Sequence, residues 1–155
     1  MFGRNNVEED AKQFWEQKEK EKGGKVHFYT FATFLGRSGE KPLTLGGLIY
    51  TIDGTVYFED FEKDSWFAKL VSRKSKYEKT EFSFNIQDIE EIKIVSKNSA
   101  LNCISGFIDE KDTKQFSRFF SMLFQSAVQL RLNSGISLFF DIMRDKDFIR
   151  ALRQS

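Results

Sequence analysis

The sequence is short of the residues on which most enzymes and most extracellular proteins depend. Its 155 residues include one histidine, one cysteine and one proline. A lone cysteine excludes an internal disulfide, and the N-terminal stretch MFGRNNVEED lacks the apolar run of a signal peptide. Both features indicate a cytoplasmic protein. The scarcity of proline argues against rigid linkers and proline-rich tails.

Net charge and long apolar runs are limited as well. The 24 Lys and Arg residues nearly balance the 23 Asp and Glu residues, so the formal charge is +1 and no overall field attracts nucleic acid. The apolar runs fall far short of the roughly 20 residues that span a bilayer. Nucleic acid is therefore not expected as a partner, and any membrane contact would be peripheral, at the inner face.

Residues suited to catalysis or metal binding are scarce. His27 begins a predicted strand and has no evident catalytic partner, and Cys103 lacks a basic neighbour that would activate its thiol. One histidine and one cysteine cannot build the usual zinc site. Three closely spaced carboxylates fit a solvated loop better than an acid/base pair: Asp60, Glu62 and Asp64. We expect a protein that is not an enzyme and holds no metal or cofactor.

The residues that are present describe one domain with an aromatic core. Eighteen phenylalanines and a hydrophobic share of 40% suit a single domain of this length. Helical spacing of apolar residues over 7–22, with Asn6 as the cap and Gly23 as the stop, predicts an N-terminal helical extension over residues 1–24.

From Lys25 onward the pattern is that of strands. Asp53-Gly54 between two apolar segments predicts a tight hairpin, and short turns between successive strands predict an antiparallel meander. A last helix, capped by Asp145, follows the final strand. The predicted strands are KVHFYTFATFLG, GGLIYT, TVYFEDF, SWFAKLVS, KTEFSFNI, EEIKIVS, QLRL and ISLFF.

One segment of high hydrophobicity interrupts these strands. Residues 109–126 show a 3.6-residue period after an acidic first turn, which predicts an amphipathic helix. The apolar arc covers about 140°, as on a helix that packs against a sheet. If the helix lies outside the core instead, the exposed face needs a partner or a second copy of the chain. The residues of this face are Phe116, Phe119, Phe120, Leu123 and Phe124.

Three stretches resemble the pleckstrin-homology superfold in its GRAM and bacterial variants: GGLIYTIDGTVYFE, FNIQDIEEIKIV and SGISLFFDIMRDKDFIRALRQ. The resemblance implies an α+β fold, with an antiparallel, strongly bent sheet or partly open barrel over residues 25–155. It also implies an N-terminal helix, a helical insertion at about 98–127 and a C-terminal capping helix. A fold of the homodimeric chaperones of bacterial secretion systems is the alternative, although those proteins are usually strongly acidic.

The resemblance further implies a non-catalytic adaptor that recruits a protein partner or an anionic membrane surface. The alternative function is that of a homodimeric secretion or assembly chaperone that uses the hydrophobic helix face. In PH-like domains basic rim loops meet lipid headgroups, and an equivalent loop is present here. The candidate contacts for a headgroup or partner are Lys69, Arg73, Lys74, Lys76 and Lys79.

Overall fold

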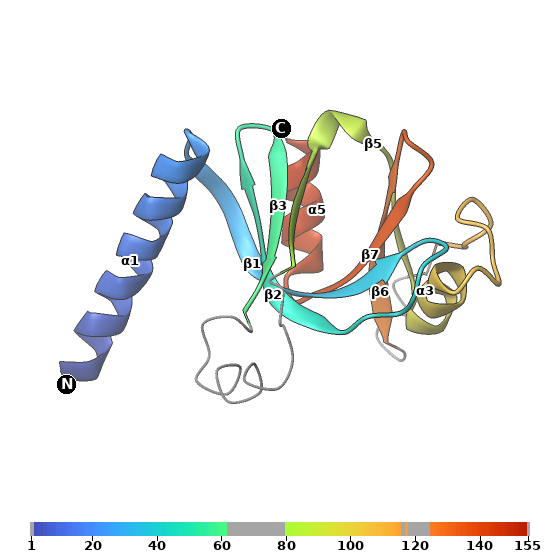
Figure 1. Cartoon of the computed structure of the whole chain (residues 1–155), viewed down its shortest axis with the longest axis horizontal. Coiled ribbons are helices and arrows are strands. Elements are labelled where there is room, and N and C mark those ends of the chain that lie inside the picture. Colours follow the sequence, from blue (N-terminus) through green and yellow to red (C-terminus); the bar gives the residue numbers. More distant parts are fainter. Residues whose placement is uncertain (1, 62–79, 116, 118–124, 155) are drawn as a thin grey trace.

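The structure is a computed structural model that describes residues 2–61, 80–115, 117 and 125–154 (Figure 1). The helices in these ranges are α1 (Phe2–Lys22), α3 (Lys97–Ile104) and α5 (Asp145–Arg153), with a short 3-10 turn, η2 (Ile86–Asp88). The strands are β1 (Val26–Arg37), β2 (Leu45–Ile52), β3 (Thr55–Asp60), β4 (Glu81–Asn85), β5 (Ile89–Ser96), β6 (Ser126–Leu132) and β7 (Ser137–Ile142).

The seven strands form one antiparallel sheet in the order β4-β3-β2-β1-β7-β6-β5. Strands β4 and β5 are the two edges of this order, so the sheet is not closed. This arrangement confirms the predicted α+β class, with an open antiparallel sheet and a helix at each end of the chain (Figure 1). The division at residue 24 into an extension and a domain stays a prediction.

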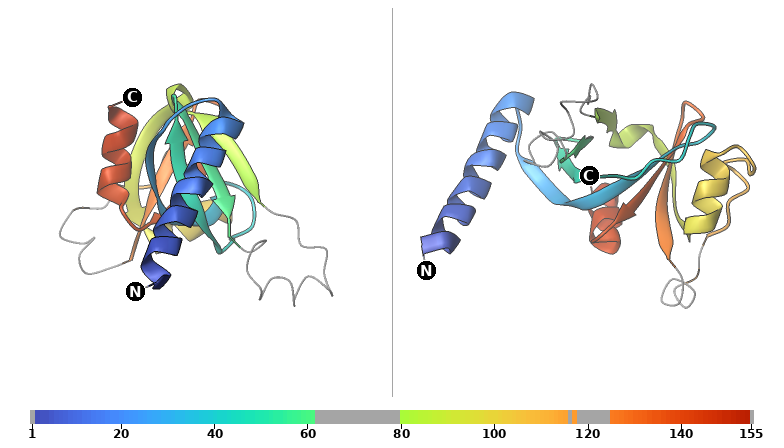
Figure 2. Two further views of the ribbon diagram at one scale, coloured as in Figure 1. Left: turned by 90° about the vertical axis from the view of Figure 1, so that its left-hand side faces the viewer. Right: turned by 60° about the horizontal axis from the view of Figure 1, so that its bottom comes forward.

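Strand β1 bends and belongs to both halves of the sheet. It pairs with β2 from Val26 to Phe34 and with β7 from Ala32 to Arg37. The register with β7 shifts between Phe34 and Gly36, and Gly36 has a φ of +132°, which favours glycine. The sheet therefore curls around its concave side (Figure 2).

The main core lies on this concave side, and α5 covers it at the open side of the sheet. Phe34 is the centre of an aromatic group, with its ring centroid 5.7 Å from that of Phe58 and 5.1 Å from that of Phe140. Phe148 and Leu152 of α5 are buried in the same core. This burial confirms that the last helix has an apolar face and plugs the open side.

A second, smaller core lies under α3. It joins residues from α3 to residues of β1, β5, β6 and β7: Leu35, Val95, Ala100, Cys103, Ile104, Ala127 and Phe139. Leu35 follows Phe34 directly in β1 but lies in this second core, since successive residues of a strand point to opposite faces. Helix α3 thus covers the outer face of the sheet, opposite α5.

Helix α1 packs on the outer face through polar and aromatic contacts. The Lys18 Nζ atom lies 2.8 Å from Glu59 Oε1, and the Tyr50 hydroxyl donates a hydrogen bond of 2.8 Å to Glu59 Oε2. The rings of Trp15 and Tyr29 are in contact, with centroids 4.5 Å apart and planes tilted by 38°. Burial raises the pKa of Tyr50, and the Glu59 carboxylate raises it further, so the hydroxyl stays a donor.

Both predicted helix caps were wrong. Helix α1 begins at Phe2, which places Asn6 inside the helix. Helix α5 begins at Asp145 itself, and Arg144 occupies the cap position without a side-chain cap. Asp145 instead lies in the first turn, where its negative charge interacts favourably with the helix dipole.

The predicted amphipathic helix over residues 109–126 is tested only at its beginning, because residues 116 and 118–124 lie outside the described residues. In the described part of the insertion predicted at about 98–127, the helix is α3, which begins after Ser96. The Ser96 hydroxyl accepts a hydrogen bond from the Ser99 amide at 3.1 Å. The described residues 109–115 form turns and irregular structure. Their side chains bond to the sheet instead: Gln115 Oε1 accepts from the Ile94 amide at 3.1 Å, and the Thr113 hydroxyl donates to Gln129 Oε1.

The hairpin at Asp53-Gly54 was predicted correctly, because its signal is local. Both residues have positive φ, 46° and 80°, as a two-residue type I′ turn requires. The turn joins β2 to β3 with Ile52 opposite Thr55. The predicted strand SWFAKLVS lies outside the described residues.

We predict that Gly47→Ala destabilises the fold and that Gly46→Ala does not. A Cβ atom at Gly47 would lie 2.3 Å from the Glu59 carbonyl oxygen of β3, whereas one at Gly46 would meet nothing within 4 Å. We expect Gly47→Ala to lower the free energy of unfolding by about 1–3 kcal/mol and Gly46→Ala to change it by less than about 0.5 kcal/mol. Urea denaturation measures both, and equal effects would contradict the described packing of β2 on β3.

Candidate binding groove

The two surfaces predicted from the sequence fall in segments that the structure does not describe. The basic residues Lys69, Arg73, Lys74, Lys76 and Lys79 lie within residues 62–79. The hydrophobic face of Phe116, Phe119, Phe120, Leu123 and Phe124 also lies outside the described residues. Both surfaces therefore stay predictions.

The residues considered for catalysis have ordinary surroundings. His27 Nε2 lies 3.3 Å from Asp53 Oδ1, and both side chains are exposed at the end of the first hairpin. Cys103 is buried in the core under α3, where burial raises the pKa of its thiol to about 11. Within the described ranges no group of three His, Cys, Asp or Glu residues could hold a metal ion.

Asp60 differs from its predicted setting. Its carboxylate is buried at the end of β3 and accepts a hydrogen bond of 2.6 Å from the Thr80 amide. This hydrogen bond holds the beginning of β4 beside the end of β3. The prediction that Asp60 lies in a solvated loop was therefore wrong. Glu62 and Asp64 lie outside the described residues.

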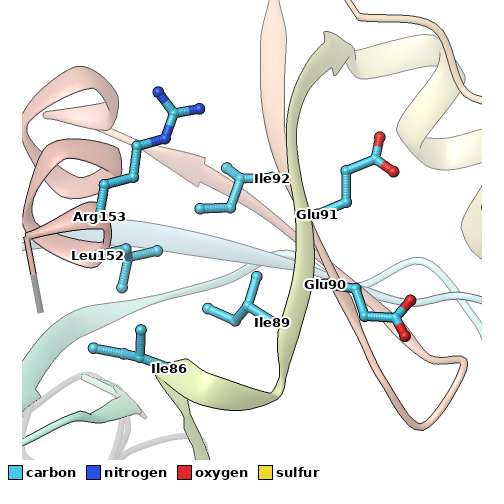
Figure 3. A pocket seen from close by; sticks show the side chains of 7 residues that line it. All are labelled: Ile86, Ile89, Glu90, Glu91, Ile92, Leu152 and Arg153. Atoms are coloured by element: carbon cyan, nitrogen blue, oxygen red, sulfur yellow. The ribbon is translucent and has the colours of Figure 1, made fainter.

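A groove between α5 and the edge strand β5 is the candidate site (Figure 3). Its volume is about 380 Å³. It lies where the two edges of the sheet fail to meet, next to η2, so the incomplete closure of the sheet creates it. The lining residues are Ile86, Ile89, Glu90, Glu91, Ile92, Leu152 and Arg153.

The inner wall of the groove is apolar. Figure 3 shows Ile86, Ile89 and Ile92 pointing toward α5, where Leu152 faces them. The three isoleucines are partly buried and pack against the main core. A spacing of three residues does not fit a regular strand, in which alternate residues share a face. The register shift between Ile89 and Glu91 makes Glu90 an extra residue, so Ile89 and Ile92 share a side.

The outer rim of the groove is the main-chain edge of β5 that faces away from β6, where Gln115 already occupies the Ile94 amide. The Ile94 amide donates to the side chain of Gln115, which shows that this amide points away from β6. Residues two apart in a strand direct their main-chain groups to the same side, so the amide and carbonyl of Ile92 point to the free edge as well. No described residue supplies a partner for these groups of Ile92. Because the groove touches side chains on both faces of β5, it includes this edge.

The charges around the groove leave one cation available. Arg131 lies 3.5 Å from Glu90 and 3.2 Å from Glu91, so both glutamates of β5 are already paired. Arg153, which is exposed at the end of α5, has no ion-pair partner among the described residues. The guanidinium lies on the α5 side of the groove (Figure 3). An incoming carboxylate would therefore be favoured there.

These features suit an extended peptide segment. Unpaired main-chain groups accept another strand, the isoleucine wall accepts an apolar side chain, and Arg153 accepts an acidic one. The sequence reading did not identify this site, because α5 and β5 are about 60 residues apart in the chain. The spacing of three between Ile86, Ile89 and Ile92 in FNIQDIEEIKIV was the available signal.

Comparisons with known proteins add little to this description. No family model matches the chain, and no curated protein matches it. A solved structure, the C-terminal domain of an unknown protein from Leishmania infantum, is similar over 93% of this chain and 95% of that chain. Its sequence identity is 13% and its TM-score 0.48. Among the described residues, no helix has the length and apolar character needed to cross a bilayer.

We predict that Cys103 is unreactive in the native protein at pH 8. With a thiol pKa of about 11, the reactive thiolate is about 100-fold less populated than at an ordinary cysteine pKa. Reaction with Ellman's reagent should be at least about 100-fold slower in buffer than in 6 M guanidinium chloride. The chain has a single cysteine, so the absorbance reports this site alone. Rapid reaction of the native protein would contradict the buried position under α3.

Proposed function

We propose that the protein is a non-catalytic, cytoplasmic adaptor of the PH-like class that captures an extended segment of a protein partner along β5. One observation carries this proposal: the free main-chain edge of β5 opens into an apolar groove. A groove with an adjoining strand edge can bind both the backbone and the side chains of a peptide.

The PH-like class is supported by the topology. The first strand is shared by a four-stranded half, β1 to β4, and a three-stranded half, β5 to β7. A C-terminal helix follows β7 and fills the open side with Phe148 and Leu152. The predicted resemblance rested on the same hairpin, corner and final helix.

Three interactions define the proposed ligand. Its main chain pairs with Ile92 at the edge of β5, which satisfies groups that otherwise face water. An apolar side chain enters between the isoleucines of β5 and Leu152 of α5. An acidic side chain or a C-terminal carboxylate pairs with Arg153, whose charge no described residue neutralises.

Partner capture at the groove is the function for which the described residues supply a surface. Recruitment to an anionic membrane depends on the basic loop, and a dimeric chaperone depends on the hydrophobic helix face. Both surfaces lie outside the described residues. The groove, in contrast, is built from described residues on three elements, η2, β5 and α5.

We predict that peptides which bind the groove lose affinity in an alternating pattern when their backbone is methylated. Peptides would be selected from a random 12-residue display library against the full chain and then synthesised with one N-methyl group at each position in turn. Methylation of residues whose amides face β5 should weaken binding about tenfold or more, and methylation of the intervening residues should have little effect. Isothermal titration calorimetry measures the affinities.

The charge reversal Arg153→Glu should weaken the binding of the selected acidic peptides about tenfold. Lys146→Glu is the matched control, because Lys146 is an exposed cation on the same helix but does not line the groove. A selection without binders, equal loss at all methylated positions, or equal effects of the two charge reversals would contradict capture along β5.

A further inference from the structure

The outer face of the sheet has an uncovered region between its two helices. Helix α1 covers this face at Tyr50 and Glu59, and α3 covers it at Phe139. The views in Figure 2 show the two helices at opposite ends of the molecule. Large apolar side chains are exposed between them, and we call these four the aromatic patch: Tyr29 at 49%, Phe31 at 54%, Phe61 at 42% and Met143 at 75%.

The patch is continuous across four strands. Tyr29 and Phe31 point outward from β1, and the Phe31 and Phe61 ring centroids are 5.6 Å apart. Met143 follows β7, and its amide donates to the Phe31 carbonyl at 3.1 Å. Single exposed apolar residues are ordinary, but a contiguous group of this kind marks an interaction surface.

The patch surrounds a hollow of about 400 Å³. Gly46 forms part of its floor, and a Cβ atom there would meet nothing within 4 Å, so the missing side chain leaves open space. Thr33 lies opposite Gly46 in the pairing of β1 and β2. The hollow can therefore take one large apolar side chain between Phe31 and Phe61, as an anchor residue of a partner requires.

The floor of the hollow offers no main-chain partner. At the hollow β1 pairs with both β2 and β7, and β2 pairs with both β1 and β3, so the main-chain groups of the floor are used within the sheet. An extended segment laid here would have to leave its own backbone groups to water or without partners. A helix satisfies its backbone internally and binds through side chains alone. The surface therefore fits a helix and not a strand.

The charge at the hollow selects a basic helix. Asp141 lines the hollow, its side chain is exposed, and no described cation lies within ion-pair distance of it. Among the described residues, neither a lysine nor an arginine lines the hollow. A lysine or arginine one helical turn from the anchor would reach Asp141. An anionic membrane would meet this carboxylate with repulsion and is disfavoured.

We propose that the aromatic patch is a second docking surface, which binds a basic amphipathic helix of a protein partner. An apolar side chain of that helix enters the hollow above Gly46, and a lysine or arginine pairs with Asp141. The described residues that line this surface and those that line the groove between α5 and β5 are different. The protein would thus hold two partners at once, an extended segment on one side and a helix on the other.

Two amidated 14-residue peptides test this proposal with the full chain. One has leucine and lysine at helical spacing, and the other has glutamate in place of each lysine. The Leu/Lys peptide should bind in fluorescence anisotropy, and the Leu/Glu peptide should bind at least about tenfold more weakly. Phe31→Thr should weaken the binding of the Leu/Lys peptide about tenfold or more. Asp141→Asn should weaken it about threefold to tenfold and make the affinity less dependent on salt concentration.

Phe107→Thr is the control, because Phe107 is 82% exposed but lies outside the patch. It should leave the affinity unchanged. Circular dichroism and thermal unfolding must show that the Phe31→Thr protein is folded, and Asp141→Asn provides a second, purely electrostatic variant. Equal binding of both peptides, equal effects of Phe31→Thr and Phe107→Thr, Phe31-dependent flotation with anionic vesicles, or a Phe31-dependent dimer in light scattering would overturn the proposal.

Discussion

The bend of β1 is the constraint on which the rest of the structure depends. One strand pairs with β2 along its first part and with β7 along its last part, so its change of direction sets the angle between the two halves. Gly36 allows the bend, because a side chain there would adopt a disfavoured φ and press against Ile104. The same bend places Phe34 in the concave core and Leu35 in the core under α3.

Buried polar contacts fix the segments that cover the outer face. Lys18, Glu59 and Tyr50 hold α1, and a separate network joins Gln129 to Glu110 and to Ser137. Such networks contribute position more than stability, because each buried charge loses hydration when it finds its partner. They explain why residues 109–115 follow the sheet and do not continue a helix.

Some local signals in the sequence were read correctly and others, such as the helix caps, were not, whereas contacts between distant segments were missed. The Asp53-Gly54 hairpin and the apolar face of α5 depend on neighbouring residues, and both were predicted. The beginning of α3 was not predicted, although the Ser96 cap that marks it is a local signal. The groove lies between α5 and β5, which are distant in the chain, and a contact between distant segments produces no periodic pattern in the sequence of either one. Only the isoleucine spacing, which reflects a bulge, marked β5 as irregular.

The two surfaces differ because one lies at an edge of the sheet and the other at its centre. A closed barrel would pair β4 with β5 and leave no main-chain edge, so it could bind partners through side chains alone. Here α5 fills the open side with Phe148 and Leu152, which protects the core without pairing with β5. The groove therefore retains a backbone edge, whereas the hollow of the aromatic patch lies where the strands of its floor pair on both sides. An extended ligand at the first surface and a helical ligand at the second follow from that single difference.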